Sequence, residues 1–465
     1  REATRHPRSP LLFRLSSLPW LLVPLFVVAA VGVSVLTPAF EAPDEVAHFG
    51  YVQHLVTTHR LPRLGQQSPA TNEAGQAPLY YLAGVLATFW LPGWTEGPRL
   101  LPTWDDHNPH ASFTPRFRQP PDLDNRNLYA HGPGERFPYR GDVLVLHVLR
   151  LVSVGFGTLA VIATLLTARE IFPTRPAVAV GAGAVLALNP QFLFMSAVVN
   201  NDAASTVLAN LTLLALARIV RRGLSFRRSV FLGVALGLSL LAKLSLLGLI
   251  PVVGLGLLIV ARQSLRYRIS VGTLFPRFQP LTQIALTGLT ALAVGGWWYW
   301  LNLRRYDDPL AWQPMLAAQG VMTRPAPIPF VEAVVALVAA RDTYWAAFGW
   351  TNVLAEPIIY VAADVLVAAA VVGFLIGAVR SVTRHWDVHS GKTGHAGSAQ
   401  VMLLLLTLWV LIAVVALVRW TQINTAGGQG RLLFPAAGAI ALLLATGVLS
   451  LVPRRVETVS AALLT

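Results

Sequence analysis

Long apolar segments divide the sequence and limit its possible folds more strongly than any other feature. A run of about 20 apolar residues is long enough to cross the hydrocarbon core of a bilayer as a helix. Of the 465 residues, 54% are hydrophobic and only 12% are charged, whereas a soluble domain carries about 25% charged residues. We therefore predict an all-α, polytopic membrane bundle. The segments long enough to span lie at residues 18–37, 143–168, 177–199, 203–219, 281–301, 358–379, 400–418 and 433–452.

The stretch 229–261 is too long for one ordinary span and contains Lys243 near its middle. Basic residues flank it on both sides, and neither flanking cluster contains an acid. Because positively charged loops remain in the cytoplasm, the stretch should cross out and return as two short helices. This gives about ten spans with both termini in the cytoplasm. The flanking residues are Arg218, Arg221, Arg222, Arg227 and Arg228 before the stretch and Arg262, Arg266 and Arg268 after it.

The other charges agree with this orientation. Acids concentrate in the loops around 38–142 and 304–357, which would lie on the outer face. The arginines before the first span favour an uncleaved signal anchor, and we expect a multi-pass protein of the cell's inner (plasma) membrane. The basic residues placed inside are Arg1, Arg5, Arg8 and Arg14, Arg169 and Arg175, Arg380, Arg384 and Lys392, and Arg454 and Arg455.

The loop 38–142 is far longer than an ordinary connection, and such loops are usually functional or disordered. Its many aromatic residues favour an ordered structure that lies against the membrane. Residues 76–91 are apolar but too short to span, because one more crossing would invert every later loop; we predict an interfacial or re-entrant helix. With no internal repeat, residues 1–465 should form a single membrane domain. The aromatic residues of the loop include Trp94, Trp104, Phe113, Phe117, Tyr129, Phe137 and Tyr139.

Composition also excludes several classes of function. The formal net charge of +14 comes from short clusters between apolar segments, which is typical of cytoplasmic loops and not of a nucleic-acid surface. The chain has no cysteine, so disulfides, thiolate metal sites and cysteine nucleophiles are excluded.

An acidic motif follows the first span directly, with Asp44, Glu45 and His48 close together. Asp44 and His48 are four residues apart and therefore share one face of a helix. In one interpretation Asp44 caps an interfacial helix and His48 faces water. In the other, these residues form a general base or a site for a divalent metal ion, because carboxylate and imidazole suit both roles.

A second polar group, Asn200, Asn201 and Asp202, joins two spans on the same outer face. Asp or Asn is an ordinary N-cap for a following helix. The two amides and the carboxylate equally suit the hydroxyl groups of a sugar. Two acidic sites on one side of the membrane suggest a shared cavity.

Three cations are candidates for an anion site. Lys243 lies at the apex of the predicted helical hairpin, where a lysine that extends its amine toward the interface is the simpler explanation. Arg431 follows a glycine-rich turn and opens the last span, an arrangement that can hold an anion. Arg341 precedes an aromatic segment in the second outer loop.

Several sequence blocks, in order along most of the chain, resemble the GT-C superfamily of integral-membrane glycosyltransferases. They are most similar to a bacterial membrane-protein family related to the protein-mannosyltransferase group. The blocks are 42–49 (APDEVAHF), 76–81 (QAPLYY), 200–202 (NND), 296–302 (GWWYWLN) with 306–309 (YDDP), 344–350 (YWAAFGW) and 430–435 (GRLLFP).

The resemblance implies transfer of a sugar from a polyprenyl-phosphate or diphosphate donor to an acceptor at the outer face, with inversion at the anomeric carbon. It implies Asp44 as the base with Glu45 beside it, and Asp202 as the second acidic position. It implies no particular metal. Leu432 stands where an aromatic residue would follow Arg431 in this family, so a detailed role for the last loop does not carry over.

Two other functions fit parts of the sequence. A non-catalytic accessory subunit of a larger membrane complex could keep the fold without the activity. A transporter would suit a broken helix with a lysine inside the membrane. Against a transporter, the polar residues gather at one membrane face and the two halves are not repeats.

Overall fold

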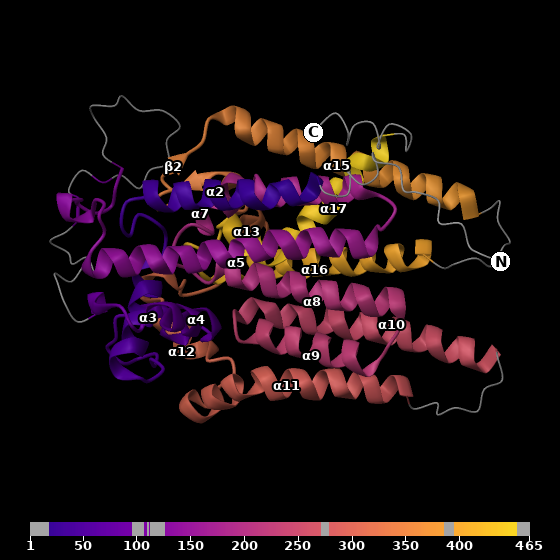
Figure 1. The fold of residues 1–465 in the computed structure, drawn as a ribbon, viewed down its shortest axis with the longest axis horizontal. Helices are drawn as coiled ribbons and strands as arrows, with labels where there is room; N and C mark the ends of the chain where they lie inside the picture. Colours follow the sequence, from indigo (N-terminus) through magenta and orange to yellow (C-terminus); the bar gives the residue numbers. More distant parts are fainter. Residues whose placement is uncertain are drawn as a thin grey trace, which may run out of the picture.

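In the computed structural model, the described residues are 18–94, 107–108, 111, 126–270, 279–385 and 395–452. Several residues considered above lie outside these ranges: Arg1, Arg5, Arg8, Arg14, Trp104, Phe113, Phe117, Lys392, Arg454 and Arg455. The described chain is a bundle of long helices with short helices gathered at one end (Figure 1).

Eight helices of the described chain are long and apolar enough to cross a membrane, which confirms a polytopic helical membrane protein. Helices satisfy their own backbone hydrogen bonds, as the bilayer core requires. These helices are α2 (Leu22–Leu36, preceded by η1, Leu18–Leu21), α5 (Gly141–Ile171), α8 (Asp202–Arg222), α10 (Leu249–Ser270), α11 (Gln279–Tyr306), α15 (Pro357–His385), α16 (His395–Ile423) and α17 (Ala437–Leu451, preceded by η8, Gly430–Ala436).

The remaining two predicted spans are shorter helices within the bundle. The first, 177–199, is broken into α6 (Pro176–Ala187) and α7 (Pro190–Met195). Asn189 caps α7 by accepting a hydrogen bond from the backbone N–H of Phe192 at 2.9 Å. It also precedes Pro190, and the residue before a proline disfavours helical geometry, so the helix breaks at this point. The stretch 229–261 reverses direction as predicted: α9 (Phe226–Leu240) ends, and the chain turns through Lys243 and η6 (Leu244–Gly248) into α10.

The centre of the bundle is α8, whose residues from Asp202 to Ile219 are nearly all buried. It packs against α5 on one side and α9 on another, and α9 packs against α11. Small residues allow close approach where helices cross, as is usual in membranes. A side chain on Gly373 of α15 would lie 1.8 Å from the backbone oxygen of Gly447 in α17, so any larger residue would separate these helices.

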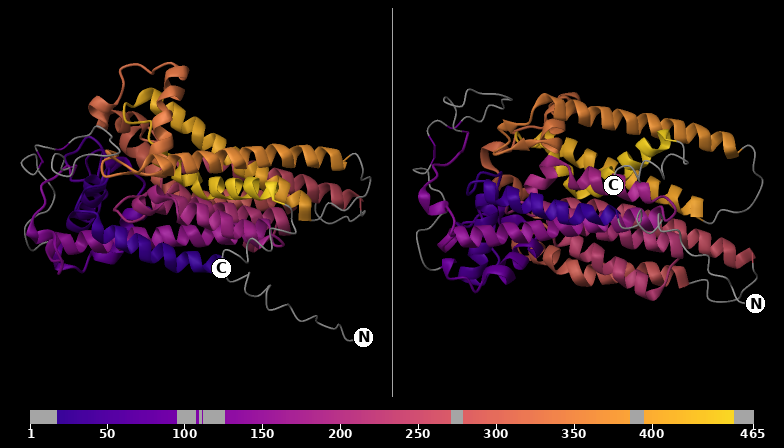
Figure 2. Two further views of the ribbon diagram at one scale, coloured as in Figure 1. Left: turned by 90° about the horizontal axis from the view of Figure 1, so that it is seen from above. Right: turned by 45° about the horizontal axis from the view of Figure 1, so that its top comes forward.

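Short elements from the two long loops cover the end of the bundle at which α8 begins (Figures 1 and 2). From the first loop come α3 (Glu45–Thr58), η2 (Thr71–Gly75), α4 (Leu79–Thr88), η3 (Pro92–Trp94) and η5 (Pro133–Glu135). The second contributes α12 (Trp312–Ala318), η7 (Gly320–Met322), α13 (Phe330–Ala336), α14 (Val338–Trp345), β1 (Ala347–Phe348) and β2 (Val353–Leu354). The two strands pair antiparallel.

The short helix expected within 76–91 is α4, which packs against α3 and α5. Its outer surface and the following turn expose Leu82, Leu86, Phe89 and Trp90. Exposed apolar and aromatic side chains of this kind are typical of the membrane interface. The helix therefore lies on the bundle as a short apolar element and does not add a span.

Candidate functional site

A cavity of about 730 Å³ opens among the elements at this end of the bundle. The turn before α3, η2, the start of α8, the Lys243 turn, α11, α12, α16 and the segment around Arg431 all contribute to its walls. Charged and titratable groups form one part of the lining, and aromatic residues form another. The charged and titratable lining residues are Asp44, His48, Glu73, Asp202, Lys243, Arg419 and Arg431.

Two carboxylates and two cations alternate within the cavity. Arg431 Nη2 lies 2.5 Å from Asp44 Oδ2, and Arg431 Nη1 lies 3.7 Å from Asp202 Oδ2. Lys243 Nζ forms an ion pair with the other oxygen of Asp202. The structure therefore brings the two acidic motifs together on one arginine, although they lie far apart in the sequence.

Asp44 occupies the N-cap position of α3, but its side chain makes no capping hydrogen bond. Its backbone is left-handed, with φ of 65°, a conformation that Asp tolerates better than most residues. Burial would raise the pKa of this carboxyl, but the charge and the hydrogen bond of Arg431 outweigh burial and lower it. Asp44 is therefore a carboxylate at neutral pH, directed into the cavity.

His48 lies one turn further along α3 and also lines the cavity, as the four-residue spacing predicted. Its Nδ1 lies 2.8 Å from the hydroxyl of Tyr81 and 4.0 Å from Glu73 Oε2. Burial lowers the pKa of His48 to about 4, so the ring is neutral at pH 7. It can accept or donate a hydrogen bond there without adding a charge.

Asn201 and Asp202 begin α8 at the cavity wall. The backbone N–H of Asp202 donates to Asn200 Oδ1 at 2.7 Å, and Asn201 Nδ2 donates to Gln76 Oε1 at 3.1 Å. Asn201 occupies the N-cap position but makes no side-chain capping bond. Asn201 and Asp202 therefore line the cavity, whereas Asn200 does not and instead binds the backbone at the start of α8.

Arg431 is held in place by close backbone packing. A side chain on Gly430 would lie 1.9 Å from the backbone oxygen of Ala340 in α14, and Gly430 N–H donates to Thr343 Oγ1 at 2.7 Å. Arg431 Nε also donates to Gln429 Oε1 at 2.7 Å. Glycine is required here because only a residue without a side chain allows this contact between α14 and the segment that carries Arg431. Leu432, the departure from the family pattern, lines the cavity as well.

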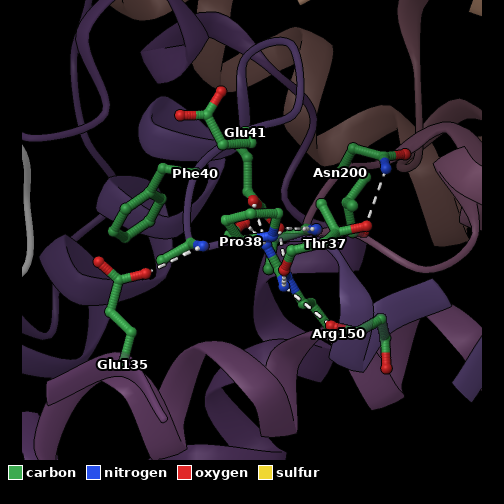
Figure 3. A network of polar contacts seen from close by, with 12 residues as sticks. Thr37, Pro38, Phe40, Glu41, Glu135, Arg150 and Asn200 are labelled. Atoms are coloured by element: carbon green, nitrogen blue, oxygen red, sulfur yellow. Dashed lines mark hydrogen bonds and ion pairs between the residues drawn. The ribbon is translucent and has the colours of Figure 1, made fainter. Parts of the chain in front are cut away.

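The structure corrects the placement of Glu45. Its carboxylate is fully buried and points away from the cavity toward Arg150, whose Nε and Nη2 donate to it at 2.9 and 2.7 Å. Arg150 also donates to the backbone carbonyls of Ser34, Thr37 and Pro38, where α2 ends. Figure 3 shows Arg150 beside Thr37 and Pro38. Consecutive residues leave a helix in different directions, so Glu45 joins the packing core while Asp44 faces the cavity.

A neighbouring network joins described residues from the beginning and the end of the first loop. Glu41 accepts hydrogen bonds at 2.8 Å from the backbone N–H groups of Leu128 and Tyr129. His131 lies between Glu41 and Glu135, with nitrogen–oxygen distances of 3.0 and 2.8 Å. Figure 3 also shows the carboxyl of Glu135 beside the backbone that leads to Phe40. This network ties the two ends of the first loop together behind Asp44.

Arg341 is also not brought to the cavity. It forms hydrogen bonds with Asp364 at 2.5 and 2.9 Å and with Asp342 at 2.8 Å, and its side chain is 37% exposed. Arg341 is not among the residues that line the cavity, so the structure does not place it beside Lys243 and Arg431. Lys243, in contrast, extends into the cavity and pairs with Asp202 instead of pointing to the interface.

Several lining residues were not identified as site residues from the sequence. Glu73 and Gln76 come from η2 and the turn after it; Gln76 opens one of the motif blocks, and Glu73 precedes it by three residues. The aromatic lining comes from distant segments, some within motif blocks. These residues are Trp298, Tyr299, Trp312, Trp350, Trp409 and Trp420.

In the described part of the chain, no group of three or more His, Asp or Glu side chains is arranged to hold a metal ion. The carboxylates of Asp44 and Asp202 are instead neutralised by Arg431 and Lys243. The arrangement suits an anion that competes with these carboxylates for the two cations.

Comparison with known proteins agrees with this architecture. Residues 144–275, under a third of the chain, match the sequence profile of the family described as dolichyl-phosphate-mannose-protein mannosyltransferase. No curated protein matches the chain in sequence.

Solved structures of two proteins illustrate the similarity. The apo structure of ArnT from Cupriavidus metallidurans is 14% identical, with 92% of this chain and 59% of that chain covered and a TM-score of 0.50. The same protein bound to undecaprenyl phosphate is 13% identical, with coverage of 92% and 59% and a TM-score of 0.48. The oligosaccharyltransferase AglB from Archaeoglobus fulgidus, in complex with an inhibitory peptide and a dolichol-phosphate, is 15% identical, with coverage of 96% and 51% and a TM-score of 0.48.

The chain thus spans between half and three fifths of the length of these proteins. At such low identity the similarity concerns the fold. The profile match begins in α5 and continues through α8, α9 and α10, the helices at the centre of the bundle. The chain therefore shares its fold with ArnT, and residues 144–275 share the profile of the mannosyltransferase family.

Proposed function

We propose that the protein transfers a sugar from a polyprenyl-phosphate donor to an acceptor hydroxyl in this cavity. The observation that carries the proposal is the placement of the Asp44 carboxylate against Arg431, with Lys243 on the far side of Asp202. A base and two cations are the groups that such a transfer needs, because a proton leaves the acceptor while negative charge develops on the phosphate.

The donor phosphate would bind between Lys243 and Arg431. Both cations line the cavity, and both are paired with carboxylates. A phosphate offers more oxygen acceptors than one carboxylate and binds arginine in a bidentate manner. Its arrival would exchange the contact between Arg431 and Asp44 for a contact between Arg431 and phosphate.

This exchange would release Asp44 to act as the base. The acceptor oxygen attacks the anomeric carbon and its proton passes to the Asp44 carboxylate. The bond from the anomeric carbon to the phosphate oxygen breaks, and its electron pair remains on the phosphate, beside the two cations. One direct displacement inverts the anomeric carbon.

The aromatic lining of the cavity suits the lipid part of such a donor. Trp298, Tyr299 and Leu244 lie where α11 meets the hairpin of α9 and α10, and Trp409 and Trp420 approach from α16. Apolar surface of this kind binds a prenyl chain by burial from water. The protein whose fold this chain shares, ArnT, binds undecaprenyl phosphate.

The cavity would face the outside of the inner (plasma) membrane. At the opposite end of the bundle, Glu170 binds Arg221 and Arg222 at 3.3 and 2.6 Å, and Arg218 lies 4.0 Å away. Basic clusters prefer the cytoplasm, so the cavity at the other end would be extracytoplasmic, with both termini inside.

The direct test is transfer from polyprenyl-phosphate sugars into added acceptors by purified, reconstituted protein. Asp44→Asn should abolish transfer, and Asp364→Asn, which changes an acid on the surface of α15, should not. Inactive wild-type protein that co-purifies in fixed ratio with other membrane subunits would favour the accessory-subunit alternative.

A further inference from the structure

Glu73 is a buried carboxyl group that neither the acidic motifs nor the proposed mechanism uses. It lies in η2 with 7% of its surface exposed, and it lines the cavity. The turn is held by hydrogen bonds from Glu73 N to Ala70 O at 2.8 Å and from Gln76 N to Glu73 O at 2.9 Å. Its Oε1 accepts a hydrogen bond from Asn72 Nδ2 at 3.0 Å. Glu73 is therefore fixed in the wall of the cavity.

Glu73 differs from the other buried acids described above in lacking a cationic partner. Glu45 binds Arg150, Glu170 binds arginines, Asp202 binds Lys243, and Glu41 accepts two backbone N–H groups and His131. Among the described residues, the basic group found within 4.0 Å of Glu73 is His48, which is neutral at pH 7. A buried carboxyl is costly unless it is hydrogen-bonded, paired or protonated.

The surroundings of Glu73 allow it to be uncharged. Burial, and then the negative charge of Asp44, raise its pKa to about 7, while the charges of Lys243 and Arg431 and a hydrogen bond with Gln76 act in the opposite direction. His48 and the phenols of Tyr51 and Tyr81 face it from α3 and α4. Helix α12 also packs against η2 and carries no titratable residue. A protonated carboxyl can both donate and accept hydrogen bonds, as a hydroxyl-rich ligand requires.

The same wall holds further groups of this chemistry. Asn72 and Gln76 line the cavity beside Glu73, and the contact between Gln76 and Asn201 joins this wall to the start of α8. There, Asp202 Oδ2 is buried without a hydrogen-bond partner among the described residues. Amides, a carboxyl and an acceptor oxygen that makes no hydrogen bond suit an uncharged ligand with several hydroxyl groups and not a second phosphate.

We propose that Glu73 binds a hydroxyl group of the transferred sugar, so that the wall formed by η2 is the sugar subsite of the cavity. This inference rests on the proposed function and assigns a place to the sugar. The phosphate would lie between Lys243 and Arg431, and the sugar would extend from it toward Asn72, Glu73 and Gln76. The anomeric carbon would then lie between the cations and Asp44.

Binding measurements can test this role without catalysis, because five tryptophans line the cavity and should report ligand binding by fluorescence. The probes are undecaprenyl phosphate and a set of undecaprenyl-phosphate sugars carrying mannose, glucose, galactose or arabinose. Wild-type protein should bind at least one sugar-bearing lipid more tightly than undecaprenyl phosphate. Glu73→Leu should weaken that binding by roughly tenfold, as expected for one lost hydrogen bond to a buried partner.

Two further variants separate this role from a structural one. Glu73→Gln keeps the size and hydrogen-bonding capacity and should retain most of the affinity. Glu332→Leu, at an exposed position of α13, should change nothing. Both Glu73 variants should bind undecaprenyl phosphate as the wild type does, which also shows that the cavity is intact.

The inference is overturned if Glu73→Leu weakens the sugar-bearing and sugar-free lipids equally or neither of them. It is also overturned if no sugar-bearing lipid binds wild-type protein more tightly than undecaprenyl phosphate. Tight, Glu73-dependent binding without transfer to any acceptor would support the sugar subsite and count against the proposed enzymatic activity.

Discussion

The guanidinium group of Arg431 lies 2.5 Å from the carboxylate of Asp44, although 387 positions separate the two residues in the chain. The pair joins the first outer loop to the start of the last span, and Asp202 of α8 lies against the same guanidinium. A group that binds Arg431 must therefore change the environment of both acids. This connection makes Arg431 the residue through which donor binding and the activation of Asp44 would be linked.

Replacing Arg431 should weaken binding of the lipid phosphate. Loss of a charge-assisted hydrogen bond costs about 1.5–3 kcal/mol, so Arg431→Gln should reduce the affinity for undecaprenyl phosphate by roughly 10- to 100-fold. Tryptophan fluorescence titration of purified protein measures this. Arg221→Gln is the matched control, because Arg221 lies at the opposite end of α8 and binds Glu170. Equal affinities of the two variants would remove Arg431 from the phosphate site.

Replacing Asp44 should abolish sugar transfer without unfolding the protein. Asn has nearly the same shape as Asp and tolerates a left-handed backbone, but it cannot accept the acceptor's proton. The loss should be about 10²–10⁴-fold, the contribution of a general base. Transfer rates at matched protein levels give the result, and His48→Ala should cost less. Full activity of Asp44→Asn would refute its role as the base.

Glu45 should stabilise the fold, whereas its neighbour Asp44 should act in catalysis. Removing one member of a buried ion pair leaves an uncompensated charge, so Glu45→Gln should cost about 3–5 kcal/mol in the free energy of unfolding. Changing Glu45 to Gln and Arg150 to Met together should cost less than the two single changes added. Thermal unfolding in detergent measures all three variants. Additive losses would show that the pair does not act as a unit.

The first loop should lose stability at alkaline pH through His131. Burial opposes its charge, but hydrogen bonds to Glu135 and Glu41 outweigh burial and raise the pKa of His131 to about 9. A raised pKa in the folded state stabilises the protein fully below pH 6.5, and this contribution disappears as the pH rises through about 9. The melting temperature should therefore fall between pH 7 and 10, and this fall should be smaller in His131→Gln. His59→Asn is the surface control and should show the same fall as the wild type. If the melting temperature of His131→Gln falls as much as that of the wild type, the role of His131 is contradicted.

The orientation of the bundle can be tested by single cysteines, since the native chain has no competing thiol. Arg227→Cys and Glu332→Cys place an exposed thiol at opposite ends of the bundle. A membrane-impermeant reagent added to intact cells should label position 332 and leave position 227 unlabelled until the membrane is opened. Labelling of both positions from outside would reject the predicted topology.

The sequence by itself determined the membrane class and most of the helical order. Membrane spans depend on local composition, because about 20 consecutive apolar residues are long enough to cross the bilayer. In lipid such a segment must form a helix so that its backbone N–H and C=O groups are hydrogen-bonded. The reversal at Lys243 and the short helix α4 also followed from local length and charge. Asp44 and His48 share a wall of the cavity because a four-residue spacing defines a helix face in any tertiary structure.

Only the tertiary structure decided which polar side chains meet. Glu45 and Asp44 are adjacent in sequence, yet one binds Arg150 in the core and the other binds Arg431 in the cavity. Arg341 and Arg431 were both predicted at the outer face as candidates for an anion site, but of the two only Arg431 contacts Asp44 and Asp202. Glu73 carries no local pattern that distinguishes it from a surface glutamate. Such contacts join segments that are far apart in the chain, and they depend on how the helices pack and rotate against one another, which local sequence does not specify.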